Sequence, residues 1–313
     1  MSDVGRQRVP LTLASLQGDR RRLRREAALR RLFLGAAALS IVISALIVLS
    51  LIREAWVFVS QVDLASLWTD GWFPRRGLYD LKTLFAGSLI VTLIAMAVAS
   101  PLGLGAAVYL SEYARPRVRQ ALKPVIETLA SIPSVVLGFF ALTFISPEVV
   151  RRFAEEATLA NLTAAGIGVG LLTIPLIASV AEDAMAAVPD ALREASSGIG
   201  ARKVTTTVKV VVPAAVSGLV AAFIIATSRA IGETMVVLIA AGASGGSLFS
   251  LDPLREGLTL TAAMATQASG TDAVVGAALT FQSLFFVGML LFLVTFGLNL
   301  VADRFVRRVR QKY

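Results

Sequence analysis

Two ionisable residues stand four positions apart within an otherwise apolar stretch, residues 214–240: Arg229 and Glu233. On a helix this spacing places both side chains on one face. A charge at the centre of a bilayer costs about 2.5–3.5 kcal/mol on insertion scales, so the pair needs an interior or wet location. Two interpretations are open. Either the pair neutralises itself and fixes the helix, or Arg229 receives an oxyanion through its planar fork while Glu233 limits how tightly the anion binds.

Hydroxyl side chains are further candidates for contact with an anion. Five of them lie in or beside apolar stretches: Thr128, Ser131, Ser134, Thr227 and Ser228. They rank below Arg229, because each can equally donate to a neighbouring helix. Ser134, together with Thr234 directly after Glu233, completes the predicted pathway set. Acidic residues near the ends of apolar stretches (Glu127, Glu182 and Asp183) are expected to be solvated at the membrane interface.

A polar, cation-bearing loop between two apolar segments has a regular spacing. Its residues are Glu194-Ala195-Ser196, Gly200 after three more, Val210 after another nine, and Val212-Pro213. The residues around this pattern predict two short helices. Pro189 and Asp190 suit a helix start, and Gly198 and Gly200 permit the turn that ends it. A second helix, roughly 202–212, is expected to run up to Pro213 in the first turn of a membrane helix.

Composition restricts the class of protein. The chain has 313 residues, 56% of them hydrophobic, and contains neither cysteine nor histidine. Its mean hydropathy of +0.75 is far above that of a soluble domain. Disulfides, thiol catalysis, the usual zinc sites and histidine general bases are therefore excluded. No Gly-x-x-x-x-Gly-Lys-Ser/Thr pattern occurs either, so we expect no catalytic residue, metal site or cofactor, and ATP hydrolysis would need another chain.

Membrane spans follow from apolar length, since crossing about 30 Å of hydrocarbon takes about 20 helical residues. Six stretches qualify: 32–52, 83–110, 125–146, 163–182, 214–240 and 279–302. Small residues along the second and fourth stretches are interpreted as helix packing, and Pro101 and Pro175 are expected to kink their helices. An even number of spans places both termini on the same side of the membrane.

Lysine and arginine predict the orientation. The segments on the side of the termini carry 22 of these residues, whereas the opposite segments, of nearly equal total length, carry 7. Cytoplasmic loops are enriched in cations, so both termini and the loop at 183–213 are placed in the cytoplasm. The basic N-terminal run is then a topology determinant beside anionic lipid heads rather than a nucleic-acid site.

The loop closely resembles the Glu-Ala-Ala (EAA) loop of ABC-importer permeases, where a membrane subunit docks on a cytoplasmic ATPase. Ser196 replaces the second Ala of that pattern and Val212 its Leu. From Leu84 to Arg308 the chain is also similar to the permeases of phosphate-specific ABC importers. Four blocks carry this resemblance: Ser100–Ala114, Glu127–Gly138, Arg229–Thr234 and Leu258–Ala265. The ending Glu233-Thr234-Met235 resembles the C-type of the two paired permeases, and Ala86-Gly87-Ser88-Leu89 departs from the family's Gly-Thr-Leu.

The resemblance implies a fold, a function and partners. The fold would be an all-α membrane protein with six transmembrane helices: a five-helix type I importer (MetI-like) core and an extra N-terminal helix. The function would be phosphate import across the cytoplasmic (inner) membrane. Partners would be a cytoplasmic ATPase dimer, a second homologous permease in a heterodimer and a periplasmic phosphate-binding protein. The ATPase would engage Glu194, Ala195, Ser196, Gly200 and Pro213, and the pathway role of Arg229 would be favoured over the structural one.

Five segments are predicted along the chain. They are a basic tail (1–31), a first helix with a periplasmic segment (32–82), the permease domain (83–302), its coupling loop (183–213) and a C-terminal tail (303–313). Alternatives remain open. Molybdate or sulfate would suit the same residues as phosphate, and a proton-coupled secondary transporter would use Glu233 as its titrating group. A membrane scaffold without transport would leave the charged pair and the loop unexplained.

Overall fold

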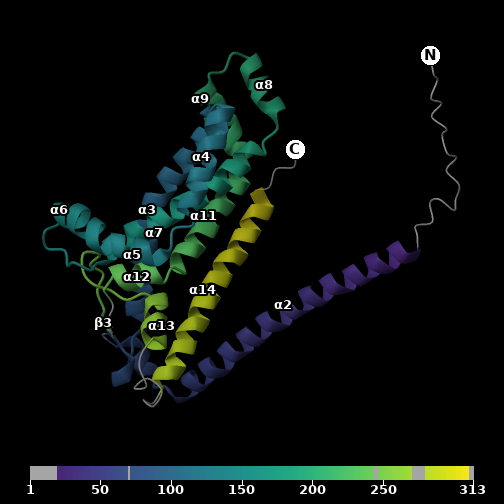
Figure 1. Ribbon diagram of the computed structural model, residues 1–313. Coiled ribbons are helices and arrows are strands. Elements are labelled where there is room, and N and C mark those ends of the chain that lie inside the picture. Colours follow the sequence, from purple (N-terminus) through teal and green to yellow (C-terminus); the bar gives the residue numbers. More distant parts are fainter. Residues whose placement is uncertain (1–19, 70, 243–245, 270–278, 310–313) are drawn as a thin grey trace, which may run out of the picture. The chain divides into compact units, whose positions relative to one another are not determined.

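The computed structural model describes residues 20–69, 71–242, 246–269 and 279–309 (Figure 1). The chain divides into two compact units, residues 1–51 and 52–313. Within the first unit, the described part is the N-terminal portion of helix α2 (Arg20–Gln61). Its apolar side chains are almost all exposed, which is expected of a helix surrounded by lipid. The predicted basic tail, 1–31, lies mostly outside the described residues.

The second unit is built almost entirely from helices. Its long helices are α3 (Leu81–Val108), α7 (Leu162–Ala186), α11 (Val216–Ile231) and α14 (Thr280–Val309). Shorter helices are α4 (Pro116–Leu129), α5 (Ser134–Phe140), α6 (Arg151–Phe153), α8 (Asp190–Gly198), α9 (Lys203–Thr206), α10 (Val212–Ala214), α12 (Met235–Ala240) and α13 (Leu260–Ala268). Three π-helical segments extend them: η3 (Tyr109–Tyr113), η4 (Ala141–Val150) and η5 (Thr207–Val211).

Glycines allow α3 and α7 to pack closely along their lengths. A Cβ atom on Gly103 would lie 2.7 Å from Cβ of Ile177, and one on Gly166 would lie 2.7 Å from Cβ of Ile94. Both distances are too short for carbon atoms, so any larger residue would push the helices apart. The packing interpretation is therefore confirmed for Gly103 and Gly166, whereas a Cβ on Gly105 would meet no atom within 4 Å. Pro101 and Pro175 lie inside α3 and α7, which continue past them.

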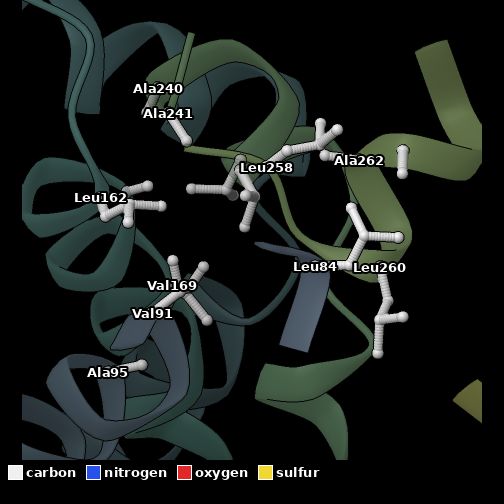
Figure 2. Packing of buried hydrophobic residues seen from close by; sticks show 14 of the residues in the cluster. Leu84, Val91, Ala95, Leu162, Val169, Ala240, Ala241, Leu258, Leu260 and Ala262 are labelled. Carbon is white, nitrogen blue, oxygen red and sulfur yellow. The ribbon is translucent and has the colours of Figure 1, made fainter. Parts of the chain in front are cut away.

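The core lies where α3 and α7 meet the end of α12 and the start of α13 (Figure 2). Leu84 and Val91 from α3 pack with Leu162 and Val169 from α7, and all four are buried. Leu258, in the segment leading to α13, is buried in the same cluster. The segment comes this close because Gly87 of α3 has no side chain: a Cβ there would collide with the carbonyl oxygen of Leu258.

A small antiparallel sheet stands beside this core. Its strand order is β2 (Leu78–Tyr79), β1 (Gly71–Phe73), β3 (Ser247–Leu248). Trp72 is paired with Tyr79 on one side and with Ser247 on the other. The aromatic rings of Trp72 and Tyr79 are buried and meet edge to face at 6.0 Å. Phe58, near the end of α2, contacts Tyr79 and also stacks on Phe286 of α14 at 4.8 Å.

Five described helices are long and apolar enough to cross a membrane, and six if one bent helix pair counts as a span. This agrees with the predicted number, but two predicted boundaries are wrong. The third span was placed at 125–146, whereas the chain breaks between α4 and α5 and the apolar helix runs from Ser134 to Phe153. Pro133 explains the break, because proline has no amide hydrogen and disfavours a helical residue before it.

The fifth span, predicted as one helix over 214–240, is interrupted twice. Lys203–Ala214 and Val216–Ile231 form two helical stretches that meet at 72°. Pro213 therefore lies near the end of the preceding stretch, not in the first turn of the membrane helix as predicted. A second break, Gly232 to Thr234, separates α11 from α12. Because of the second break, Arg229 and Glu233 do not lie on one face of a continuous helix.

Candidate functional site

Arg229 and Glu233 do not form the predicted pair. Arg229 lies in the last turn of α11, and Glu233 lies beyond the helix end at Ile231. Among the described residues no ion pair joins Arg229 to an acidic group. The expectation failed because i and i+4 side chains share a face only while the helix continues, and α11 ends at Ile231.

Glu233 instead joins two helix starts. Its carboxylate oxygen Oε1 accepts a long hydrogen bond (3.4 Å) from the amide of Val236 in the first turn of α12. Its carbonyl oxygen accepts a hydrogen bond of 2.7 Å from the hydroxyl of Thr261 in α13. Ser88 of α3 holds the same helix, since its Oγ accepts from the amide of Leu260 at 3.0 Å. Glu233 therefore has a positioning contact that the sequence did not indicate.

Arg229 is exposed on the surface of this chain. A fixed cation within an apolar span is costly against lipid, so its exposed side chain requires water, an anion or another protein surface beside it. Beside it, the Oγ atom of Ser228 is buried and has no hydrogen-bond partner within the described structure. Arg229 is thus a donor whose fork is not occupied by a carboxylate of the described residues.

The two remaining members of the predicted set lie near the same break. Thr234 is partly buried, and its Oγ1 donates to the carbonyl of Gly232 at 3.2 Å. Ser134 is the first residue of α5, which packs against α12 through Gly138. A Cβ at Gly138 would lie 3.1 Å from the carbonyl oxygen of Met235. The fold brings α5 and α12 together, but within the described residues no hydrogen bond or ion pair joins the four predicted side chains to one another.

The loop at 183–213 folds into the two short helices that were expected, and we call it the two-helix loop. In Figure 1, α8 and α9 lie at one end of the second unit, beyond the end of α4. The turn after α8 depends on Gly200, whose φ of +80° is in the left-handed region that favours glycine. Its amide donates to the carbonyl of Ser197 at 2.9 Å, which closes the end of the helix.

A hydroxyl contact fixes the angle between the two helices. Oγ of Ser196 and Oγ1 of Thr206 lie 2.8 Å apart, and both residues are buried. Ser196, one of the two departures from the EAA pattern, therefore has a structural use in this chain. Glu194 and Ala195 are exposed, and Ile199 is 87% exposed at the tip. An exposed apolar tip beside a carboxylate is suited to a protein partner.

Arg193, not Glu194, anchors the loop. The exposed side chain of Glu194 makes no hydrogen bond or ion pair among the described residues. The Arg193 guanidinium donates to the Glu112 carboxylate, with Nη2 2.9 Å from Oε1. It also donates to the carbonyls of Met185 and Val188 at the end of α7. The hydrogen bond with Glu112 raises the pKa of Arg193 above its usual range.

A second ionic cluster joins α4 to α7. Arg119 and Lys123 lie one turn apart on α4, and both donate to the carboxylate of Glu182, from Lys123 Nζ at 2.6 Å. Asp183 accepts from the same Nζ at 2.8 Å, and this bond is the main cause of a raised pKa of Lys123. The Glu182 side chain is 0% exposed. The expectation that solvent satisfies Glu182 is therefore wrong, because two cations from α4 cover it.

The comparisons with known proteins bear on this arrangement of helices. The sequence pattern of the family described as "Binding-protein-dependent transport system inner membrane component" matches residues 99–311, more than half of the chain. The chain belongs to this family. It is a multi-pass membrane protein and a permease subunit, and the loop and the break in α11–α12 both lie within the matched residues.

Relatives with curated names cover most of the permease. The phosphate transport system permease protein PstC of Mesorhizobium japonicum is 30% identical over 292 residues, or 88% of each chain. PstC of Pasteurella multocida is 29% identical over 289 residues, covering 86% of this chain and 87% of that protein. The probable ABC transporter permease YqgH of Bacillus subtilis is 38% identical over 164 residues, and this match spans only 53% of YqgH.

A solved structure shows the same fold. The inward-facing methionine ABC transporter MetNI matches 73% of the permease and 94% of the solved chain, with a TM-score of 0.53 and 21% identity. At this identity the likeness concerns the fold alone. The expected type I, MetI-like architecture is confirmed by it.

Sequence reasoning found the loop and the arginine but missed the contacts that position them. Arg193 was counted only as a cation of the loop, and Glu112 only as part of a family block. A signal did exist for one cluster, because Arg119 and Lys123 have the i, i+4 spacing that places two cations on one helix face. The acidic partners are about 60 residues away in sequence, so no local pattern pointed to them.

Proposed function

We propose that this permease is the C-type membrane subunit of an ATP-driven importer of inorganic phosphate. The observation that carries the proposal is the alignment with PstC over 86–88% of the chain, in proteins of similar length. The folded two-helix loop supports it independently, because its exposed surface offers a partner ATPase a place to dock. Molybdate or sulfate as the cargo, and coupling to protons, are the alternatives that the experiment below separates.

The energy comes from a separate cytoplasmic ATPase dimer. No nucleotide-binding pattern of the Walker type occurs in the sequence. The surface offered to the ATPase is the two-helix loop, with Glu194 and Ala195 exposed on α8 and Ile199 exposed at the turn. Gly200 and Ser196 shape this surface from inside, while Pro213 ends the helical stretch that returns to the membrane.

The cation count supports an orientation in which both termini and the two-helix loop are cytoplasmic. The sheet beside Trp72 then lies on the periplasmic side, where a phosphate-binding protein delivers the anion. A second homologous permease completes the membrane part as a heterodimer. That subunit supplies a protein surface opposite Arg229, whose exposure within a membrane span needs one.

Phosphate passes Arg229 about halfway through the membrane. A hydrated anion meets a high electrostatic barrier in low-dielectric surroundings, and one fixed cation lowers it. The guanidinium fork matches phosphate oxygens, and no carboxylate in the part of the chain that the structure describes is paired with it. Glu233, four residues on, keeps the anion from binding too tightly, and the hydroxyls of Thr234 and Ser134 supply neutral donors on the same path.

Reconstitution tests this function. The purified complex of both permeases and the ATPase, in vesicles with the binding protein added, is expected to accumulate radiolabelled phosphate only when ATP is present. Excess sulfate or molybdate is expected to leave this uptake unchanged. The permease alone is expected to hydrolyse no ATP and to concentrate no phosphate. Uptake by the isolated chain under a proton gradient would refute the proposal. If sulfate or molybdate inhibits the uptake of radiolabelled phosphate more strongly than unlabelled phosphate does, that oxyanion is the cargo instead.

A further inference from the structure

Two consecutive residues at the end of η3 contact both helices of the two-helix loop. Glu112 accepts hydrogen bonds from Arg193 of α8. Tyr113 presents its ring to the ammonium group of Lys203 in α9, 5.1 Å from the ring centroid. The π-helix η3 directly continues α3, the helix that packs along α7. The end of α3 therefore contacts each helix of the loop through a different kind of interaction.

The Arg193 contact uses the whole guanidinium group. Nε and Nη2 donate to the two oxygens of Glu112, at 3.4 and 2.9 Å. Nη2 also donates to the carbonyl of Met185 at 2.8 Å, and Nη1 donates to the carbonyl of Val188 at 2.6 Å. The remaining N–H faces Asp190 at 3.1 Å. All five donors of the group have partners, which lie on η3, on α7, on the linker at 187–189 and on α8.

The burial of the two carboxylates differs sharply. The Glu112 side chain is 6% exposed, whereas Asp190 is 87% exposed. Ser111 also donates to Glu112, at 3.0 Å, and fixes that carboxylate further. An exposed ion pair contributes little, while a nearly buried, two-oxygen contact with arginine is directional and strong. Glu112 is thus the structural partner of Arg193, and Asp190 is the matched exposed control.

These contacts attach the loop to a second helix. Along the chain, α8 is attached to α7 only through residues 187–189 and would pivot on this linker. The contacts with Glu112 and Tyr113 give the loop further attachments, to the other helix of the α3–α7 pair. A push on α8 is then delivered to α7 and α3 together instead of being absorbed by the linker.

We propose that Glu112 and Tyr113 are positioning residues that transmit movement of the two-helix loop to α3, through Arg193 and Lys203. This inference rests on the proposed function, in which the ATPase docks on that loop. In this proposal, movement of the loop is transmitted to the end of α3 as well as to the linker that joins α8 to α7. The residues touch neither ATP nor the transported anion.

The functional test compares Glu112→Gln with Asp190→Asn in the complete reconstituted complex. Glu112→Gln removes the charge but keeps the size of the side chain, and Arg193→Lys keeps the charge but loses the fork. Both are expected to lower the phosphate imported per ATP hydrolysed about fivefold or more, with the ATPase still bound. Asp190→Asn is expected to keep the wild-type ratio. Tyr113→Leu is expected to lower the ratio, whereas Tyr113→Phe, which keeps a ring, is expected to preserve it.

A purely structural role of Glu112 would give other results in these measurements. If Glu112→Gln releases the ATPase during purification, the contact supports docking rather than transmission, and the inference is wrong. An unchanged ratio in both Glu112→Gln and Arg193→Lys would also overturn it. The ratio of phosphate to ATP serves as the readout because a simple loss of folded complex lowers both rates together and leaves the ratio unchanged.

A distance measurement tests the inference without relying on phosphate transport. The chain contains no cysteine, so spin labels can be placed specifically through Ala191→Cys on α8 and Gln120→Cys on α4, both exposed positions. In the complex, Glu112→Gln is expected to broaden the distance distribution between these labels, and Asp190→Asn is not. An unchanged narrow distribution in Glu112→Gln would overturn the inference. If the wild-type complex imports no phosphate, the proposed function fails, and this measurement still decides whether Glu112 holds the loop.

Discussion

Arg229 shows that a local break in a helix changes which contacts a charged residue can make. The sequence left a self-neutralising pair and a pathway cation as alternatives, and both assumed a continuous helix. Because α11 ends before Glu233, its carboxylate accepts from the amide of Val236 in α12, and its backbone carbonyl accepts from Thr261 of α13. Among the described residues, a substitution of Arg229 then leaves no carboxylate without its partner, which makes the residue well suited to mutagenesis.

We therefore expect Arg229→Gln to leave the complex assembled and to impair transport. Loss of one charge-assisted hydrogen bond, about 1.5–3 kcal/mol, corresponds to a fall in phosphate uptake of about tenfold or more. The measurement is the initial rate of uptake by vesicles at matched amounts of complex. Arg255→Gln, at another exposed arginine, serves as the control and should transport normally. Near-normal uptake by Arg229→Gln would remove this residue from the pathway.

Glu182 is a second residue whose role depends on distant partners. We expect Glu182→Gln to lower the free energy of unfolding by about 1–2 kcal/mol. This is less than the roughly 3–5 kcal/mol for a fully buried pair, because Arg119 and Lys123 are partly exposed and can be solvated. Thermal unfolding in detergent measures the change. Asp183→Asn, at a side chain that is 65% exposed, is expected to change it by less than about 0.5 kcal/mol. Equal losses in the two variants would contradict this account.

At the scale of elements, the sequence predicted which helices exist better than where they break. Apolar length identified the spans because each must cross the same thickness of hydrocarbon. The breaks before α5 and after α11 were not predicted, because a few irregular residues do not change the apolar length of a span. Neighbouring helices can satisfy the backbone groups of such residues. Pro133 and Gly232 were visible as breakers, but Pro101 and Pro175 were equally visible and lie inside continuous helices. Tertiary contacts decide between these outcomes.

The turn between α8 and α9 is an element whose geometry was predicted from its glycine. Gly200→Ala places a side chain at a φ of +80°, which costs about 1–2 kcal/mol, although a Cβ there meets no atom within 4 Å. We expect normal membrane insertion but less ATPase bound to the purified permease, because the turn must distort. Gly198→Ala is the matched control: a Cβ there also meets no atom within 4 Å, and Gly198 is the last residue of α8, without a positive φ. If Gly200→Ala binds the ATPase as well as Gly198→Ala does, the turn geometry is not needed for docking.

At the scale of the whole molecule, the class and the family followed from composition and from four sequence blocks. The predicted domain boundaries, the orientation of the termini and the partners stay predictions. The contacts of Glu112, Glu182 and Glu233 could not be predicted, because each joins elements far apart in sequence. Their positions depend on how α3, α4, α7 and α13 pack, and the sequence does not specify that packing locally.

The sheet residue Trp72 tests how far the cooperative core extends toward the N-terminus. Trp72 is 1% exposed and packs on Tyr79, so Trp72→Ala leaves a cavity. We expect a loss of about 3–5 kcal/mol in the free energy of unfolding, as for other large-to-small changes in cores. Thermal unfolding of the purified permease measures it. Trp68→Ala, at an exposed tryptophan nearby, is expected to be nearly neutral. A small effect of Trp72→Ala would mean that the segment folds apart from the helices.

The stacking of Phe58 on Phe286 has a consequence for building chimeric permeases. The region shared with the family begins at residue 99, which suggests residue 99 as the place to exchange parts between relatives. A junction there would set a foreign Phe58 and Trp72 against the native α14. Thr280 of that helix, whose hydroxyl donates to the carbonyl of Pro74 at 3.1 Å, would also lose its own partner segment. The boundary between the two compact units, after Leu51, avoids both mismatches. Parts of related permeases should therefore be exchanged at the boundary of the compact unit rather than at the first residue that matches the family.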